Sequence, residues 1–257
     1  MLLVNWGYYI FNDWQAAQFT VEQGASIADW MNAFATSLDE LAWFSMLFLF
    51  ELETYWLDKE TMSRLTRFTI VAIRFASYSF LAHTVYAYSF NYLEFSDAAL
   101  LPGIQHVCDL VDNDFTFLRN NAYTAIDAAS CGSLSAASTL YQVGDNRIIT
   151  DLAGLQEITF LSYIDIQDAL VWLAVVLVIE MTVLLQERGI SAGPLITGGN
   201  WLTVGLNAVL IMHAVIWAWK GHWVFAWDEV LWIGGFAAIE LNLSEWRHDM
   251  LDEAAPA

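Results

Sequence analysis

Apolar positions along the chain gather into five long runs that are separated by shorter polar stretches. A helix of about 20 apolar residues spans the hydrocarbon core of a bilayer, which is about 30 Å thick. The runs lie at 39–57, 68–91, 166–186, 200–219 and 224–244. Glu51 and Glu53 interrupt the first run, although residues 41–50 are almost wholly apolar. The pattern predicts an all-α, polytopic integral membrane protein with about five transmembrane helices.

The stretches between the runs complete the predicted organisation. Residues 1–37 start with an apolar, aromatic segment that is too short to span and lacks the basic n-region and cleavage site of a signal peptide. Aromatic rings favour the membrane–water interface, so we expect this segment to lie there, with a second interfacial helix over 26–36. The predicted order is the interfacial segment 1–37, a transmembrane hairpin 38–91, an extramembrane insertion 92–165, a second hairpin 166–220, and a fifth helix with its tail at 221–257.

The few basic residues predict the orientation. They follow the first, third and fifth runs, at Lys59, Arg64, Arg67, Arg188 and Arg247, with Lys220 as the exception in a short loop. Short cytoplasmic loops carry an excess of Lys and Arg. We therefore expect the N-terminus and the insertion outside and the C-terminus in the cytoplasm, as in a protein of a bacterial inner membrane.

The two cysteines fall together in the insertion. Cys108 and Cys131 are the only cysteines of the sequence. An isolated pair in a non-cytoplasmic segment is most simply a disulfide. The alternative is two thiols or half of a metal site with His106, whose spacing matches no zinc pattern.

A short motif occurs three times at the same spacing. An aspartate is followed by a tryptophan four residues later and a glutamate eight residues after that, at Asp39/Trp43/Glu51, Asp168/Trp172/Glu180 and Asp228/Trp232/Glu240. The second and fourth runs carry histidines at similar positions, His83 and His213. Together with the motif they indicate a parallel internal repeat, in which the first and second runs correspond to the third and fourth. The aspartates are interpreted as helix caps and the tryptophans as an interfacial belt.

Helix capping and an interfacial belt account for the aspartates and tryptophans of the motif, but not for its glutamates. Twelve residues of helix cover about 18 Å, which places Glu51, Glu180 and Glu240 beyond the bilayer midplane. Ionisable groups there are costly and usually functional. We expect them to form an ion or proton site with Arg74, which could pair with Glu51 on an adjacent helix, and with Asn207. The alternatives are that the glutamates make neutral hydrogen bonds that tie helices together, or that the helices end earlier and the carboxylates reach water.

The leading functional hypothesis is proton or cation translocation, alone or as a subunit of an energy-transducing complex. A second hypothesis is an accessory subunit of a larger membrane complex, because the fifth helix leaves the repeat incomplete. A third is a subunit that binds haem or a chlorophyll-type pigment through His83 and His213, two imidazoles at one depth. No metal or cofactor is specified beyond that third hypothesis.

Composition narrows the partners. The chain is 58% hydrophobic and carries a formal charge of -20, which opposes nucleic acid binding. The expected partners are the lipid bilayer and other membrane subunits or further copies of the chain. The sequence has none of the nucleotide-binding, zinc-protease or nucleophile-elbow motifs, so it leaves open whether the protein is an enzyme.

Overall fold

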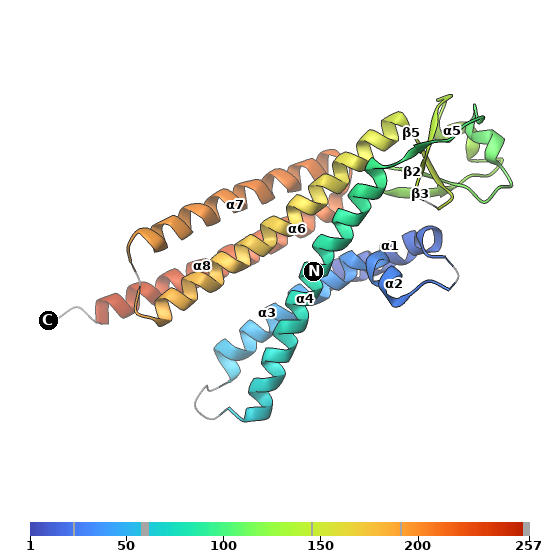
Figure 1. Ribbon diagram of the computed structural model, residues 1–257. Coiled ribbons are helices and arrows are strands. Elements are labelled where there is room, and N and C mark those ends of the chain that lie inside the picture. Colours follow the sequence, from blue (N-terminus) through green and yellow to red (C-terminus); the bar gives the residue numbers. More distant parts are fainter. Residues whose placement is uncertain (23, 58–61, 145, 191, 254–257) are drawn as a thin grey trace. The chain divides into compact units, whose positions relative to one another are not determined.

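The computed structural model describes residues 1–22, 24–57, 62–144, 146–190 and 192–253, without the side chains of 54, 55, 186, 187 and 239–253. The fold is mostly helical, with 72% of residues in helices. It divides into two units, each described by itself. The N-terminal unit is Trp6–Ile166, and the C-terminal unit combines Met1–Asn5 with Gln167–Ala257 (Figure 1).

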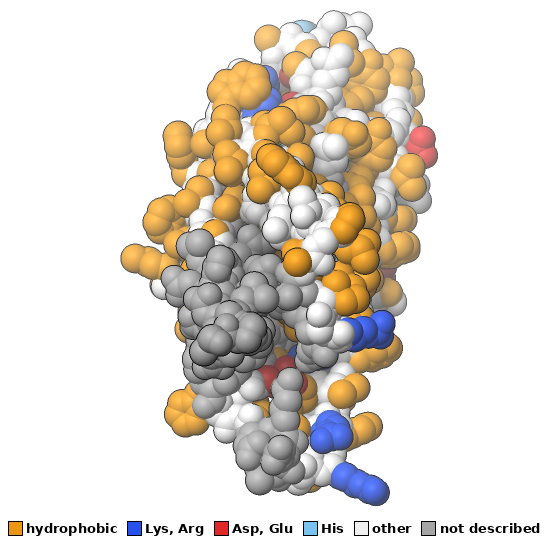
Figure 2. Space-filling view, turned by 90° about the vertical axis from the view of Figure 1, so that its left-hand side faces the viewer, with side chains coloured by type: hydrophobic (Ala, Val, Ile, Leu, Met, Phe, Trp, Pro, Cys, Tyr) orange, Lys and Arg blue, Asp and Glu red, His pale blue; other side chains and the backbone are white. Residues whose placement is uncertain are grey.

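Three helices in the described part are long and apolar enough to cross a membrane: α4 (Arg64–Ser96), α6 (Leu152–Glu187) and α7 (Pro194–Trp219). A fourth span is counted if α2 (Ile27–Ala33) and α3 (Ala35–Glu51), which are bent by 78°, act as one broken helix. Large apolar side chains such as Phe75, Leu177 and Val215 point outward from these helices. Hydrophobic side chains accordingly cover much of the face in Figure 2. Such surfaces suit lipid rather than water.

The N-terminal unit begins with α1 (Leu2–Thr20), which continues from the other unit, and α2. The helix expected over 26–36 is instead broken at Phe34, and α3 starts at Ala35. Ser26 and Asp29 form a capping box at the start of α2. A π-helical turn (Leu52–Trp56) closes α3, and Ser63 caps the first turn of α4. Helices α3 and α4 pack against each other as a hairpin.

The N-cap residue of α3 makes no side-chain hydrogen bond to the helix, and a carboxylate of α1 accepts from the first turn instead. Phe34 offers no side-chain oxygen, and the free backbone N–H of Ser37 donates instead to Asp13 Oδ2 at 2.9 Å. The Ser37 hydroxyl donates to the same oxygen at 2.6 Å, and Trp6 Nε1 donates to the Ser37 carbonyl at 3.0 Å. A carboxylate is the favoured group at a helix N-terminus. Asp13 thus fixes α1 to the first turn of α3.

Asp13 is expected to make stability depend on pH. Burial raises the pKa of its carboxyl from 3.8 to about 6, although the two hydrogen bonds from Ser37 lower it in part. The folded chain then binds this proton more tightly than the unfolded chain, so its contribution to stability is full below pH 3.8 and is lost as pH rises to about 6. Thermal unfolding in detergent at about pH 4 and about pH 7 should show a smaller pH effect for Asp13→Asn than for the native chain. An unchanged pH effect in Asp13→Asn, or a reduced one in the exposed control Asp97→Asn, would contradict this assignment.

The insertion folds into a small mixed domain, here called the sheet domain (residues 97–151). Its five strands are β1 (Ala99–Leu100), β2 (Thr116–Arg119), β3 (Ala122–Ala125), β4 (Leu140–Val143) and β5 (Ile148–Asp151). They lie in the order β1-β4-β5-β2-β3, with β2 and β5 parallel and the other pairs antiparallel. Asn120 and Asn121 turn the β2–β3 hairpin with positive φ angles of 49° and 58°, a conformation that Asn tolerates well. This sheet was not expected, because the apolar pattern of the sequence predicted helices only.

One side of the sheet domain is held by a buried apolar core and a disulfide. Cys108, in the short 3-10 helix Val107–Leu110, is bonded to Cys131 at the start of α5 (Cys131–Leu134), which confirms the predicted pair. The buried members of this core are Val107, Leu110, Phe117, Ile126, Cys131, Leu140 and Ile149.

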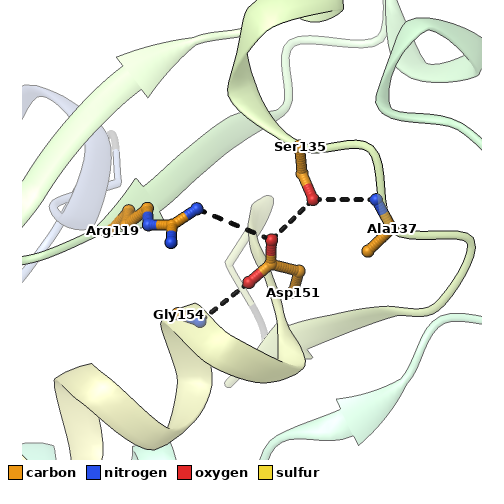
Figure 3. A network of polar contacts seen from close by, with 5 residues as sticks. All are labelled: Arg119, Ser135, Ala137, Asp151 and Gly154. Carbon is orange, nitrogen blue, oxygen red and sulfur yellow. Dashed lines mark hydrogen bonds and ion pairs between the residues drawn. The ribbon is translucent and has the colours of Figure 1, made fainter.

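The last residue of β5 joins the sheet domain to α6. Asp151 Oδ1 accepts a hydrogen bond from the Gly154 N–H at 2.7 Å, in the first turn of α6, and Oδ2 accepts one from the Ser135 hydroxyl at 2.5 Å (Figure 3). Arg119 Nη1 lies 3.8 Å from Oδ2. Helix α6 starts at Leu152, within the predicted insertion 92–165. A single helix therefore runs from the sheet domain into the third apolar run.

The C-terminal unit consists mainly of the second half of α6, α7 and α8 (Trp223–Glu253). Pro194 begins α7, a position where its missing N–H costs nothing. Helices α7 and α8 pack against each other after a tight turn in which Gly221 has a φ of 87°. Each of the five predicted runs thus overlaps one long helix, while the described residues support three to four spans.

Candidate functional site

Three helices of the C-terminal unit each place one ionisable side chain in a common site. Asp168 comes from α6, His213 from α7 and Glu229 from α8, and we call them the carboxylate–histidine cluster. His213 Nδ1 lies 2.8 Å from Asp168 Oδ1. Glu229 lies beside Asp168, close enough for a hydrogen bond between the two side chains. The cluster therefore places one polar group from each of α6, α7 and α8 in a common site.

The cluster is buried. The His213 side chain is fully enclosed, Glu229 is 7% exposed, and the Asp168 side chain is 20% exposed. Trp172, one turn after Asp168, donates its indole N–H to Glu229 Oε1 at 3.2 Å. The second oxygen of Glu229 meets no N–H or O–H donor among the described residues. Two adjacent carboxylates cannot both ionise cheaply in a low dielectric. A proton on either Asp168 or Glu229 would allow one carboxyl to donate a hydrogen bond to the other.

The cluster lies inside the helices rather than at their ends. His213 precedes the end of α7 by six residues, and Glu229 follows the start of α8 by six residues, so each lies about 9 Å along its helix. Next to it, Asn5 Nδ2 donates to Asp228 Oδ1 at 2.6 Å, and both residues are buried. Asp168 and Asp228 are therefore not the helix caps that the sequence suggested, because α6 and α8 begin well before them.

The residues predicted for the ion site take other positions. Glu51 is exposed at the end of α3, and Arg74 forms its ion pair with Glu53 at 2.5 Å rather than with Glu51. Glu180 is exposed on α6. Asn207 donates its amide N–H to the Thr203 carbonyl of its own helix at 3.0 Å. The side chain of Glu240 lies outside the described residues.

The two histidines proposed as cofactor ligands differ in their surroundings. His213 is fully buried with one nitrogen next to Asp168, whereas His83 on α4 is half-buried with its ring 6.0 Å from that of Tyr86. No group of three or more His, Cys, Asp or Glu side chains in the described part of the chain is arranged to hold a metal ion. The geometry thus gives His213 a carboxylate partner, which suits proton chemistry.

Glu229 was not among the residues predicted for the ion site, although the repeated motif contains a signal for it. Both Asp39 and Asp228 are followed directly by a glutamate, and Glu40 and Glu229 are each less than 10% exposed. In the N-terminal unit the tryptophan of this motif donates to its own aspartate, from Trp43 Nε1 to Asp39 Oδ2 at 3.1 Å. The Asp-Glu-x-x-Trp pattern therefore marks a buried glutamate one turn before a tryptophan.

Comparison with known proteins found no match to a family model, to a curated protein or to a solved structure.

Proposed function

We propose that the protein is an integral membrane protein that moves protons or cations across the bilayer, alone or as a subunit of an energy-transducing complex. The observation that carries this proposal is the buried cluster of Asp168, His213 and Glu229 on three adjacent helices. Ionisable groups inside membrane helices are expensive and are retained mainly where ions or protons pass. Asn, Ser or Thr would tie helices together without that cost.

The proposed topology has five spans, formed by α3, α4, α6, α7 and α8, with a parallel repeat. Two independent features support its orientation. Arg64 and Arg67 lie at the start of α4 and Arg188 follows α6, whereas the opposite ends of both helices lead into the disulfide-bonded sheet domain. Basic residues favour the cytoplasmic side and disulfides persist outside it. We therefore place the N-terminus and sheet domain outside and the C-terminus in the cytoplasm of a bacterial inner membrane.

Ion flux into proteoliposomes that contain the purified chain tests the function. Glu229→Gln keeps the size of the side chain and removes its charge, so we expect flux to fall at least about tenfold. Glu180→Gln, an exposed carboxyl on α6, should retain most of the flux. The opposite result, with loss in Glu180→Gln alone, would return the site to the mid-bilayer glutamates predicted from the sequence.

The second candidate is an accessory subunit of a larger membrane complex. It is supported by the large apolar side chains exposed on α4, α6 and α7, among them Phe75, Leu177 and Val215, which another subunit or a second copy could cover as well as lipid. The same liposome experiment separates translocation by the chain alone from the accessory role, because an accessory subunit on its own would carry no ion in any variant.

A further inference from the structure

We infer that the species handled by the carboxylate–histidine cluster is the proton, which passes along Glu229, Asp168 and His213 as a relay. This inference rests on the proposed function and names its substrate.

The hydrogen-bond partners of the Asp168 and Glu229 oxygens favour a proton over a metal cation as the species that is handled. Asp168 Oδ1 faces a ring nitrogen and Glu229 Oε1 accepts an indole N–H. Metal cations such as Ca²⁺ or Mg²⁺ require six or more oxygen ligands that converge on one point. Here the oxygens are directed at separate partners, Asp168 Oδ1 at the His213 ring and Glu229 Oε1 at the Trp172 indole N–H. The arrangement is one of hydrogen bonds in series.

His213 provides both ends of a transfer step. Nδ1 is 2.8 Å from Asp168, and Nε2, on the far side of the ring, is buried without a hydrogen-bond partner among the described residues. With its hydrogen on Nδ1, a neutral imidazole offers a free lone pair on Nε2. Burying an unsatisfied polar atom is costly, so Nε2 is the position at which a water or another proton carrier would meet the cluster.

The relay conserves charge at every step. A water donates a proton to His213 Nε2, the hydrogen on Nδ1 passes to Asp168 Oδ1, and the proton that Asp168 and Glu229 share moves to Glu229 and is released to a second water. One proton enters for each one that leaves, and the imidazole returns to its first tautomer before the next. Trp172 is a positioning residue that holds Glu229 by its N–H. Asp228, the residue before Glu229, accepts a hydrogen bond from Asn5 Nδ2.

Proton flux through proteoliposomes, followed with an enclosed pH-sensitive dye under a potassium diffusion potential, tests the relay. We expect the native chain to carry protons equally well with sodium or choline as the main outside cation, at the same potassium gradient. His213→Gln and Asp168→Asn should each lower proton flux at least about tenfold, because neither amide relays a proton. His222→Gln, at the half-buried turn between α7 and α8, is the matched control and should retain it.

An infrared measurement gives a second readout that does not depend on transport. The carbonyl band of a protonated, buried carboxyl should be present in the native protein near neutral pH and should be lost in Glu229→Gln. A native chain that carries no ion would overturn translocation by the chain alone. Sodium or potassium flux that survives His213→Gln, or an infrared spectrum without the carboxyl band, would overturn the proton relay and leave the wider function in place.

Discussion

Removal of the Cys108–Cys131 disulfide is expected to destabilise the sheet domain by about 3 kcal/mol. The bond closes a loop with a sequence separation of 23 residues, and a loop of that size restricts the unfolded chain by about this amount. The domain has only four- and two-residue strands, so its core is small and the cross-link supplies a large part of its stability.

Thermal unfolding of the purified chain with and without reductant measures this effect. We expect the sheet domain of the double variant Cys108→Ser/Cys131→Ser to unfold at a midpoint temperature more than about 10 °C below that of the native chain. Reductant should reproduce the shift in the native chain and should leave the double variant unchanged. Equal melting of all samples would show that the apolar core alone sustains the domain.

The second large effect is expected from Asp151→Ala. The substitution leaves the Gly154 N–H and the Ser135 hydroxyl without their buried acceptor and removes the cap of α6. Loss of a cap costs about 1 kcal/mol and a buried polar group without a partner costs about as much or more, so we expect a loss of about 2–3 kcal/mol. The first turn of α6 should then exchange its amide hydrogens faster, as mass spectrometry of hydrogen exchange can measure.

Arg119→Ala is the matched control for that network. Its guanidinium is half-exposed and 3.8 Å from the carboxylate, a geometry that contributes less than about 1 kcal/mol. A loss in Arg119→Ala as large as that in Asp151→Ala would mean that the ion pair, rather than the helix cap, joins the sheet domain to α6.

The sheet domain illustrates what residue patterns do not reveal. Its strands are only two to four residues long, and strands this short carry too few alternations for a period of two to be recognised. Residues 152–165 precede the third apolar run and form the first part of α6, so the helix begins before its apolar run does. The cysteine pair was predictable, because compartment logic needs only the count of cysteines and their position.

The site illustrates the same limit at the level of single residues. Asp168 resembles a helix cap when apolar runs alone define where helices begin, but α6 begins much earlier, at Leu152. Helix α8 begins at Trp223, one residue before the predicted run 224–244, so Asp228 already lay inside that run and could not cap it. Glu229 was passed over for Glu240, since a glutamate deep in an apolar run is conspicuous and one next to an aspartate is not.

The sequence by itself determined that the protein belongs in a membrane, where its long apolar helices lie, and that Cys108 and Cys131 pair. These properties follow from composition and chain length, which every conformation of the chain shares. Only the tertiary structure decided that Arg74 meets Glu53 and that Asp168, His213 and Glu229 come together. Such contacts depend on the rotation of each helix about its axis, and uniformly apolar helices leave that rotation to packing between neighbours.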